Sequence, residues 1–214
     1  MRTIISRSLF ATAVAAAALG LAVTSASATA QANFTIVNPN ADGSFTASLK
    51  AGTTADLLDT ATNQSVTCYS ATASGLATNG THTGPPLATI TSATFGDPVS
   101  DPCDGPLGSS FSAVSTSTIN LNAASYSGGI TSGSLSNVNV TITGDTLFGV
   151  CTAKISGTAS NAAYNNATGE LSITNGAGLT ISNVSNCASL MNNGDAATFS
   201  AVYKLAKPIT VTSP

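Results

Sequence analysis

The sequence of 214 residues predicts an all-β fold, an antiparallel β-sandwich or barrel, and three observations support this prediction. Apolar and polar residues alternate with a period of two in several segments, which is typical of half-buried strands. Pairs of turn-forming residues separate these segments at intervals of about 8–12 residues, as they do in sandwiches and barrels. No segment within 33–214 has the periodicity of an amphipathic helix.

The first element, residues 1–32, has the pattern of a cleaved secretory signal helix. A short basic segment, Met1–Arg7, precedes the apolar run Leu9–Val23. This run is shorter than the roughly 20 apolar residues that a membrane-spanning helix needs. The A-x-A sites that follow would allow cleavage after Ala28, Ala30 or Ala32. We therefore expect no stable membrane anchor and a mature protein that is secreted to the extracellular space or cell wall.

The expected strands of the mature chain are short, about ten to fourteen in number, and rich in Thr and Val. The clearest alternations place apolar residues on one face at Val138–Ile142, Ala153–Ile155, Leu171–Ile173 and Phe199–Tyr203. The expected turns are Asp42-Gly43, Asn79-Gly80, Gly84-Pro85-Pro86, Gly128-Gly129, Asn175-Gly176 and Asn193-Gly194. We expect residues 91–108, which contain three prolines, to be largely loop, and we expect one helical turn over residues 188–192.

The mature chain has the features of an internal duplication, with pseudo-repeats at about 33–118 and 119–214. Each half contains two cysteines about 35 residues apart, and each contains Phe-Ser-Ala-Val, beginning at Phe111 and Phe199. The alternative is that Ser- and Thr-rich strands resemble one another by composition alone. We expect one all-β domain over residues 33–214, with two separate small domains as the alternative.

The duplication also predicts how the cysteines pair. Four cysteines allow three connectivities, and equivalent halves favour Cys68–Cys103 with Cys151–Cys187. Disulfides persist in exported proteins, and closing a loop of about 35 residues contributes about 3–4 kcal/mol in the chain-entropy model. Metal binding by these thiols is disfavoured because the chain has no C-x-x-C and no histidine near a cysteine.

The composition excludes several classes of partner. Charged residues make up 7% of the chain, against about 25% in ordinary soluble domains, and the formal net charge is −3. The mature chain has four lysines against nine acids, so it lacks the basic stripe that nucleic-acid phosphates require. Apolar residues reach 43%, which is enough to build a core and argues against disorder.

Few residues suggest catalysis. The single histidine, His82, lies in a Gly-rich segment that reads as an exposed turn, where no buried acid would orient it for a Ser-His-Asp triad. The chain has no G-x-S-x-G motif and no Trp. A carboxylate pair for glycoside hydrolysis would have to come from Asp97, Asp101, Asp104, Asp145, Glu170 and Asp195. We therefore expect no enzymatic activity and no cofactor.

Three of these acids, Asp97, Asp101 and Asp104, lie within one segment and are candidate calcium ligands, because Ca²⁺ binds six to eight oxygens. Their spacing does not match the EF-hand template. The alternative is that Asp-Pro and Asp-Gly simply form turns, and the sequence favours it.

Several runs resemble an uncharacterised family of small secreted actinobacterial proteins. They are VSNCASLMNNGDAATF at 184–199, ITVTSP at 209–214, CDGPLG at 103–108 and TGEL at 168–171. Some members of that family are named for a twin-arginine signal, which this chain lacks because Arg2 and Arg7 are not adjacent. The resemblance implies export from a Gram-positive cell, and it assigns no catalytic residue.

The sequence therefore predicts a secreted, non-enzymatic β protein that acts in the cell envelope, by surface contact or by self-association. The first alternative is a carrier of a small apolar ligand, lined by inward residues such as Phe111, Phe148 and Phe199. A cavity of several hundred cubic ångströms would favour the carrier, and a solid core would exclude it. The second alternative is a hydrolase.

Overall fold

The structure, a computed structural model, describes residues 33–146 and 149–214. The predicted signal segment and Phe148 lie outside these ranges. Within them the all-β prediction is confirmed, and the helical content is one 3-10 turn, η1 (Pro106–Gly108). The strands are β1 (Asn33–Val37), β2 (Ser44–Leu49), β3 (Ala55–Asp59), β4 (Gln64–Cys68), β5 (Ala71–Leu76), β6 (Gly80–Thr83), β7 (Ala88–Phe95), β8 (Cys103–Asp104), β9 (Ser110–Ser115), β10 (Ile119–Ser127), β11 (Ile130–Thr146), β12 (Gly149–Asn165), β13 (Glu170–Ser185), β14 (Ala196–Leu205) and β15 (Thr210–Thr212).

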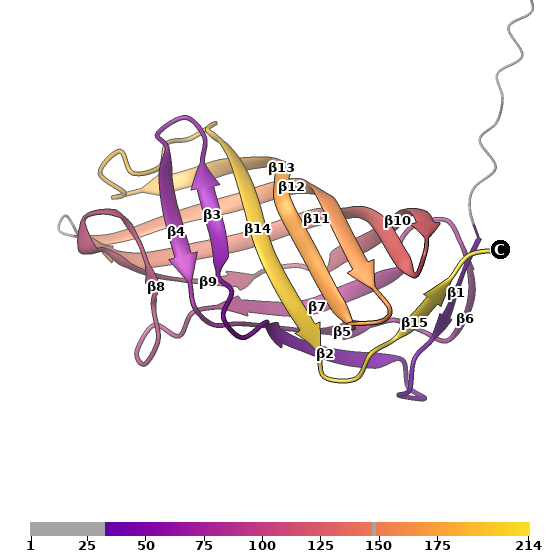
Figure 1. Cartoon of the computed structure of the whole chain (residues 1–214). Helices are drawn as coiled ribbons and strands as arrows, with labels where there is room; N and C mark the ends of the chain where they lie inside the picture. The colour runs from indigo at the N-terminus through magenta and orange to yellow at the C-terminus, as the bar shows by residue number, and fades with distance from the viewer. Residues whose placement is uncertain (1–32, 147–148) are drawn as a thin grey trace, which may run out of the picture. The chain divides into compact units, whose positions relative to one another are not determined.

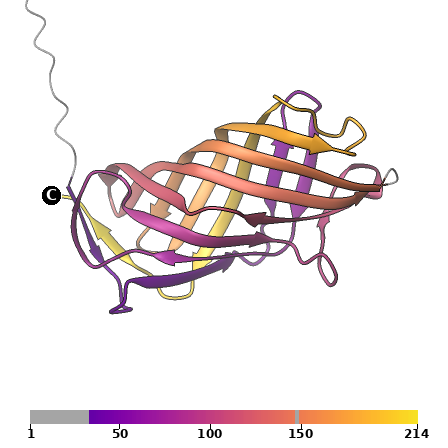
Figure 2. The ribbon, with the colours of Figure 1, turned by 180° about the vertical axis from the view of Figure 1, so that it is seen from behind.

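The main sheet is antiparallel and closes on itself (Figures 1 and 2). Strands β11, β12, β13 and β14 lie side by side and form one wall. At one end of these strands, β2, β5, β7 and β10 complete a ring from β14 back to β11. At the other end, β3, β4, β8 and β9 complete a second ring between the same two strands. The sheet therefore forms a barrel, whose interior we call the lumen.

The long strands correct the prediction of short ones. Strands β11 and β12 have 17 residues each, and the predicted turn at Asn175-Gly176 lies inside β13. Asn175 has a positive φ of 47°, and the register between β13 and β14 shifts beside it. Asn137 in β11 and Asn161 in β12 are in the same conformation, each beside a register shift. These asparagines form bulges that bend continuous strands, because Asn tolerates positive φ in bulges as well as in turns.

Other local predictions have mixed outcomes. Asp42-Gly43, Gly128-Gly129 and Asn193-Gly194 lie at turns as predicted. The segment 91–108, predicted to be largely loop, begins as strand, because β7 continues to Phe95 by pairing with β5 and β9. The helical turn predicted at 188–192 is also wrong: Ala188 and Ser189 both have positive φ. The chain turns there so that the adjacent side chains of Leu190 and Met191 are both buried.

The predicted alternation is confirmed in the core. Val138, Val140 and Ile142 are buried on β11, and Ala153 and Ile155 are buried on β12. The largest fully buried side chain is that of Phe111 on β9. Its ring occupies space left by two glycines, since a Cβ atom on Gly105 or Gly144 would overlap it.

A three-stranded sheet, β15-β1-β6, lies at one end of the barrel (Figure 1). Its buried side chains include Phe34 and Ile36. The backbone of Ile209 and Val211 is hydrogen-bonded by two side chains in place of a neighbouring strand. The Tyr164 hydroxyl donates to the Ile209 carbonyl (2.7 Å) and accepts from the Ile209 N–H (2.9 Å). The Asn166 amide makes the equivalent pair of bonds to Val211, at 2.7 and 3.0 Å.

Strand pairing crosses the boundary between the two predicted pseudo-repeats. Strand β10 pairs with β7, β11 pairs with β9, and β14 pairs with both β2 and β3. The described residues belong to one compact unit. The duplication itself stays a prediction.

Both predicted disulfides are present. Cys68–Cys103 joins β4 to β8, and Cys151–Cys187 joins β12 to the segment after β13. Among the described residues no cysteine is free. Both bonds lie in the ring that contains β3, β4, β8 and β9, and they are consistent with an oxidising extracellular compartment.

Removing one disulfide tests its contribution to stability. In Cys68→Ala/Cys103→Ala, we expect the free energy of unfolding to fall by about 3–4 kcal/mol, because the unfolded chain regains the entropy of an open loop. Denaturant unfolding measures the change, and peptide mapping without reductant checks the pairing. A peptide that joins Cys68 to Cys151 or Cys187 would contradict the assigned connectivity.

Buried Asn38 links the β1–β2 and β5–β6 connections. Its amide nitrogen donates to the carbonyls of Gly43 (2.9 Å), Ser44 (3.2 Å) and Ala77 (3.0 Å). Its backbone N–H donates to the Asn79 side chain at 2.6 Å. The two N–H groups of this amide are shared among the three carbonyl oxygens, and a side chain that only accepts cannot replace them.

Asn38→Asp should therefore lower the free energy of unfolding by about 2–3 kcal/mol, since a buried carboxylate would face three carbonyl oxygens. The matched control is Asn193→Asp, because exposed Asn193 uses its side-chain oxygen to accept from the Val184 N–H (2.9 Å) and Asp keeps that acceptor. We expect the control to change stability by less than about 0.5 kcal/mol. Equal losses in urea unfolding would disprove this role of Asn38.

Candidate functional site

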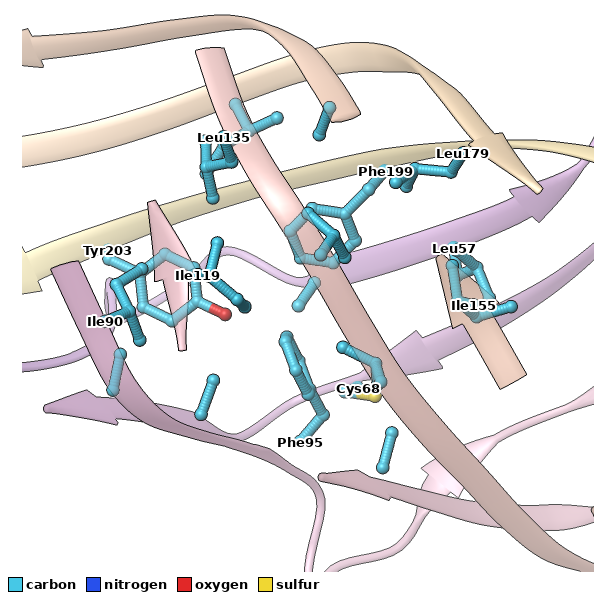
Figure 3. Close-up of a pocket in the computed structure, with 18 of the residues that line it drawn as sticks. Leu57, Cys68, Ile90, Phe95, Ile119, Leu135, Ile155, Leu179, Phe199 and Tyr203 are labelled. Carbon is cyan, nitrogen blue, oxygen red and sulfur yellow. The ribbon is translucent and has the colours of Figure 1, made fainter. Parts of the chain in front are cut away.

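The lumen contains an apolar cavity of about 90 Å³ (Figure 3). Its walls come from both rings, from Phe45 on β2 to Leu57 on β3 and Phe95 on β7. Phe111 and Phe199 line it, as the sequence predicts for an apolar carrier, whereas Phe148 lies outside the described residues. The cavity exists because these side chains leave the centre of the barrel incompletely filled.

A second apolar cavity, of about 80 Å³, lies between the barrel wall and the three-stranded sheet. Ile36, Ile209 and Val211 line it from the side of that sheet. Three residues, Phe45, Leu171 and Leu205, line both cavities. The two cavities are therefore neighbours that share part of one wall.

Aromatic side chains meet across the larger cavity. The rings of Phe95 on β7 and Phe199 on β14 are 5.6 Å apart between centroids and nearly perpendicular, with an interplanar angle of 87°. This edge-to-face geometry is a favourable one for aromatic pairs. Strands β7 and β14 are not neighbours in the sheet, so this contact crosses the lumen.

Two residues of polar type line the larger cavity, Ser112 and Tyr203. Ser112 alternates with Phe111 and Ala113 on β9, so its side chain lies on the opposite face of the strand. Tyr203 is 6% exposed, and its side chain points into the space among the labelled apolar residues of Figure 3. No hydrogen bond to its hydroxyl is found among the described residues. Burial raises the pKa of this hydroxyl well above its ordinary value of 10.

Two polar atoms within the described ranges are fully buried and lack a partner. One is Oγ1 of Thr131, a residue that lines the smaller cavity. The other is Oδ2 of Asp59, in a carboxylate that is 2% exposed. The second Asp59 oxygen, Oδ1, accepts from the N–H groups of Ala61 (2.9 Å) and Thr62 (3.1 Å), so Asp59 shapes the β3–β4 hairpin.

The structure does not gather the candidate calcium ligands. Asp97 Oδ1 accepts from the N–H groups of Val99 (2.9 Å) and Ser100 (2.8 Å), and these bonds lower the pKa of the carboxyl group. A β-bridge joins Asp97 to Asp101, whereas Asp104 is the acid that interacts with the hydroxyl of Tyr69. Across residues 33–146 and 149–214, no group of three or more His, Cys, Asp or Glu side chains is placed to hold a metal ion. The hydrogen bonds and the β-bridge of Asp97 fit the alternative interpretation, in which these acids form turns.

The exposed turn predicted for His82 is wrong. His82 lies on β6, paired with Phe34 of β1, and is half-buried. Its Nε2 atom is 2.8 Å from the carbonyl oxygen of Thr78. The cause is the pairing of β6 with β1, a segment more than forty residues earlier in the chain.

The remaining candidate acids lie at strand ends. Glu170 at the start of β13 forms an ion pair with Lys50 (3.0 Å). Asp195 precedes β14 and accepts from the backbone and side chain of Asn192, both at 3.0 Å. Asp145 is exposed near the end of β11. The described part of the chain includes no helix of the length and apolarity that crossing a membrane requires.

Sequence reasoning assigned no role to Tyr203 or Asp59. The alternation over Phe199–Tyr203 correctly placed Tyr203 on an inward face, with Ala201. The signal that distinguishes it is a hydroxyl at an inward position of an otherwise apolar strand face. Asp59 carried the weaker signal of an acid at the start of a turn.

The high pKa of Tyr203 makes alkaline stability a measure of its burial. Above about pH 10 the unfolded chain releases the phenol proton while the folded chain keeps it, so stability falls as the pH rises. Tyr203→Phe removes this term, and we expect its stability to fall less steeply than that of the wild type. Denaturant unfolding from neutral pH to about pH 11 measures both curves. Curves that stay parallel above pH 10 would contradict the burial of an ionisable hydroxyl here.

Comparisons of the chain with protein-family models, curated proteins and solved structures gave no match. The residues that line the lumen are therefore the observations that bear on function.

Proposed function

We propose that this protein is a secreted, non-enzymatic carrier that holds a small apolar ligand in the lumen of its barrel. The observation that carries this proposal is the apolar cavity of about 90 Å³ at the centre of a closed sheet. Sites for small molecules are typically concave and mostly apolar, with few polar groups. A purely structural role in the cell envelope, which the sequence favours, does not require such a space.

The size of the cavities limits the ligand. Sites for drug-sized molecules measure about 300–1,000 Å³, whereas an apolar cavity of about 150 Å³ accommodates benzene. The cavity in the lumen measures about 90 Å³, and the neighbouring cavity of about 80 Å³ shares Phe45, Leu171 and Leu205 with it. The lumen therefore has neither a solid core nor the cavity of several hundred cubic ångströms expected of a carrier. Each cavity is smaller than the one that accommodates benzene, so the ligand is at most the size of a single small ring or a short chain.

Two observations support the secreted location. Disulfides are rare in reducing compartments, and this chain contains two. The resemblance to secreted actinobacterial proteins, on the runs around Cys187 and Cys103, points the same way. The non-enzymatic assignment rests on Asp97 and Asp195, which accept hydrogen bonds at turns, and on Glu170, which forms an ion pair.

Benzene tests the lumen directly. We expect benzene to cause saturable chemical-shift changes at the methyl groups of Ile90, Ile119 and Leu135 in the disulfide-bonded protein. Filling the cavity with Ala93→Leu should abolish these changes. The matched control Ala177→Leu adds the same atoms at an exposed position of β13 and should leave binding intact. If the wild type shows no saturable change, or if both variants behave alike, the lumen is not a binding site.

The natural ligand can be sought by native mass spectrometry of the protein secreted by its own producing cells. We expect an additional mass that leaves on gentle activation. A mass equal to that of the mature, disulfide-bonded chain alone would instead favour the structural or surface-contact role.

A further inference from the structure

We propose that the Tyr203 hydroxyl is the polar anchor of the lumen, and that the natural ligand is a neutral, mainly apolar molecule with one hydrogen-bonding oxygen, such as a small ketone or alcohol. This inference rests on the proposed carrier function. Beyond that function, it specifies the chemical class of the ligand.

The first step is that the hydroxyl lacks a partner in the protein. Tyr203 lines the larger cavity and is 6% exposed, and no hydrogen bond to it is found within the described ranges. Buried tyrosine hydroxyls usually find a partner, because an unsatisfied one is costly. A Phe at this position would fill the same space without that cost. The hydroxyl is therefore explained by a partner that the protein does not provide.

The second step excludes water as a sufficient partner. A buried water molecule typically makes about three hydrogen bonds, with a range of two to four. The side chains around Tyr203 in the cavity wall, including Ile90, Ile119 and Leu135, are apolar. A ligand that brings its own apolar body needs only one hydrogen bond, which Tyr203 supplies.

The third step fixes the charge of the ligand. The lysine next to Tyr203 on β14, Lys204, is exposed, and no charged residue lines the larger cavity. A carboxylate or an ammonium group in the lumen would therefore be buried without a counter-ion, which is strongly unfavourable. Burial keeps the Tyr203 hydroxyl protonated, so it can donate to a neutral oxygen. Fatty acids and amines do not fit this site.

The experiment compares two probes of similar shape, cyclohexanone and methylcyclohexane. We expect Tyr203→Phe to weaken cyclohexanone binding about tenfold and to leave methylcyclohexane binding unchanged or slightly stronger. The matched control is Tyr126→Phe, because half-buried Tyr126 lines neither cavity and its hydroxyl makes no hydrogen bond within the described ranges. We expect Tyr126→Phe to bind both probes as the wild type does.

Infrared spectroscopy supplies a readout that a change in folding stability would not reproduce. A hydrogen bond from Tyr203 lowers the carbonyl stretching frequency of bound cyclohexanone, and we expect this shift in the wild type and Tyr126→Phe but not in Tyr203→Phe. Circular dichroism first confirms that each variant is folded.

The outcomes separate the two proposals. If the wild type binds neither probe, the carrier function fails. If it binds both and Tyr203→Phe changes neither the ratio of affinities nor the carbonyl frequency, the lumen is a carrier site and the anchor role of Tyr203 is disproved. Recovery of a pure hydrocarbon from the native protein would also overturn the anchor.

Discussion

The structure depends on the closure of its antiparallel sheet. Closure is possible because β11 and β14 each pair, along one edge, with two different strands. Residues 203–205 of β14 pair with β2, and residues 197–200 pair with β3. Strand β11 divides its edge in the same way between β10 and β9. Because the sheet closes, its backbone groups find partners and one face of the long strands is turned away from water. That face has to be apolar, since unpaired polar groups are costly there. The lumen is the direct consequence of closure.

Closure also explains why asparagine occurs inside the long strands. A continuous strand that serves two rings has to bend, and Asn137, Asn161 and Asn175 adopt positive φ beside the register shifts of β11, β12 and β13. The alternation of apolar residues is local, so the sequence predicted the fold class and the buried faces of these strands correctly. Strand length is not local, because Asn-Gly has the same local preference in a bulge as in a hairpin turn. The pairing of β6 with β1, which places His82 on a strand, is hidden from local reasoning for the same reason.

For the candidate site too, the sequence predicted which residues face inward but not which contacts they make there. Phe111 and Phe199 were expected to line an interior because each lies on an alternating strand, and both do. The disulfides were predictable because Cys68 and Cys103, and likewise Cys151 and Cys187, have similar spacings in the sequence, and the predicted duplication favours these pairs. The position of Tyr203 on an inward face was also predictable, but its significance was not. Whether a buried hydroxyl has a partner depends on which side chains the opposite strands place near it. For Tyr203 those strands include β7 and β10, which come from distant parts of the chain.

In the function proposed above, the larger cavity distinguishes its ligands mainly through the Tyr203 hydroxyl. Apolar contacts discriminate weakly, since one methylene in a hydrophobic pocket is worth only about 1–3 kcal/mol, whereas a site built to hydrogen-bond a ligand rejects analogues that lack the matching group much more strongly. The larger cavity offers Phe, Leu, Ile, Val and Ala side chains that any apolar molecule of suitable size can contact. Tyr203 adds a directional requirement at one position. No charged residue among those described lines the larger cavity, so in the site that we propose Tyr203 is the one donor aimed into that cavity, and it would set the orientation and the class of the ligand.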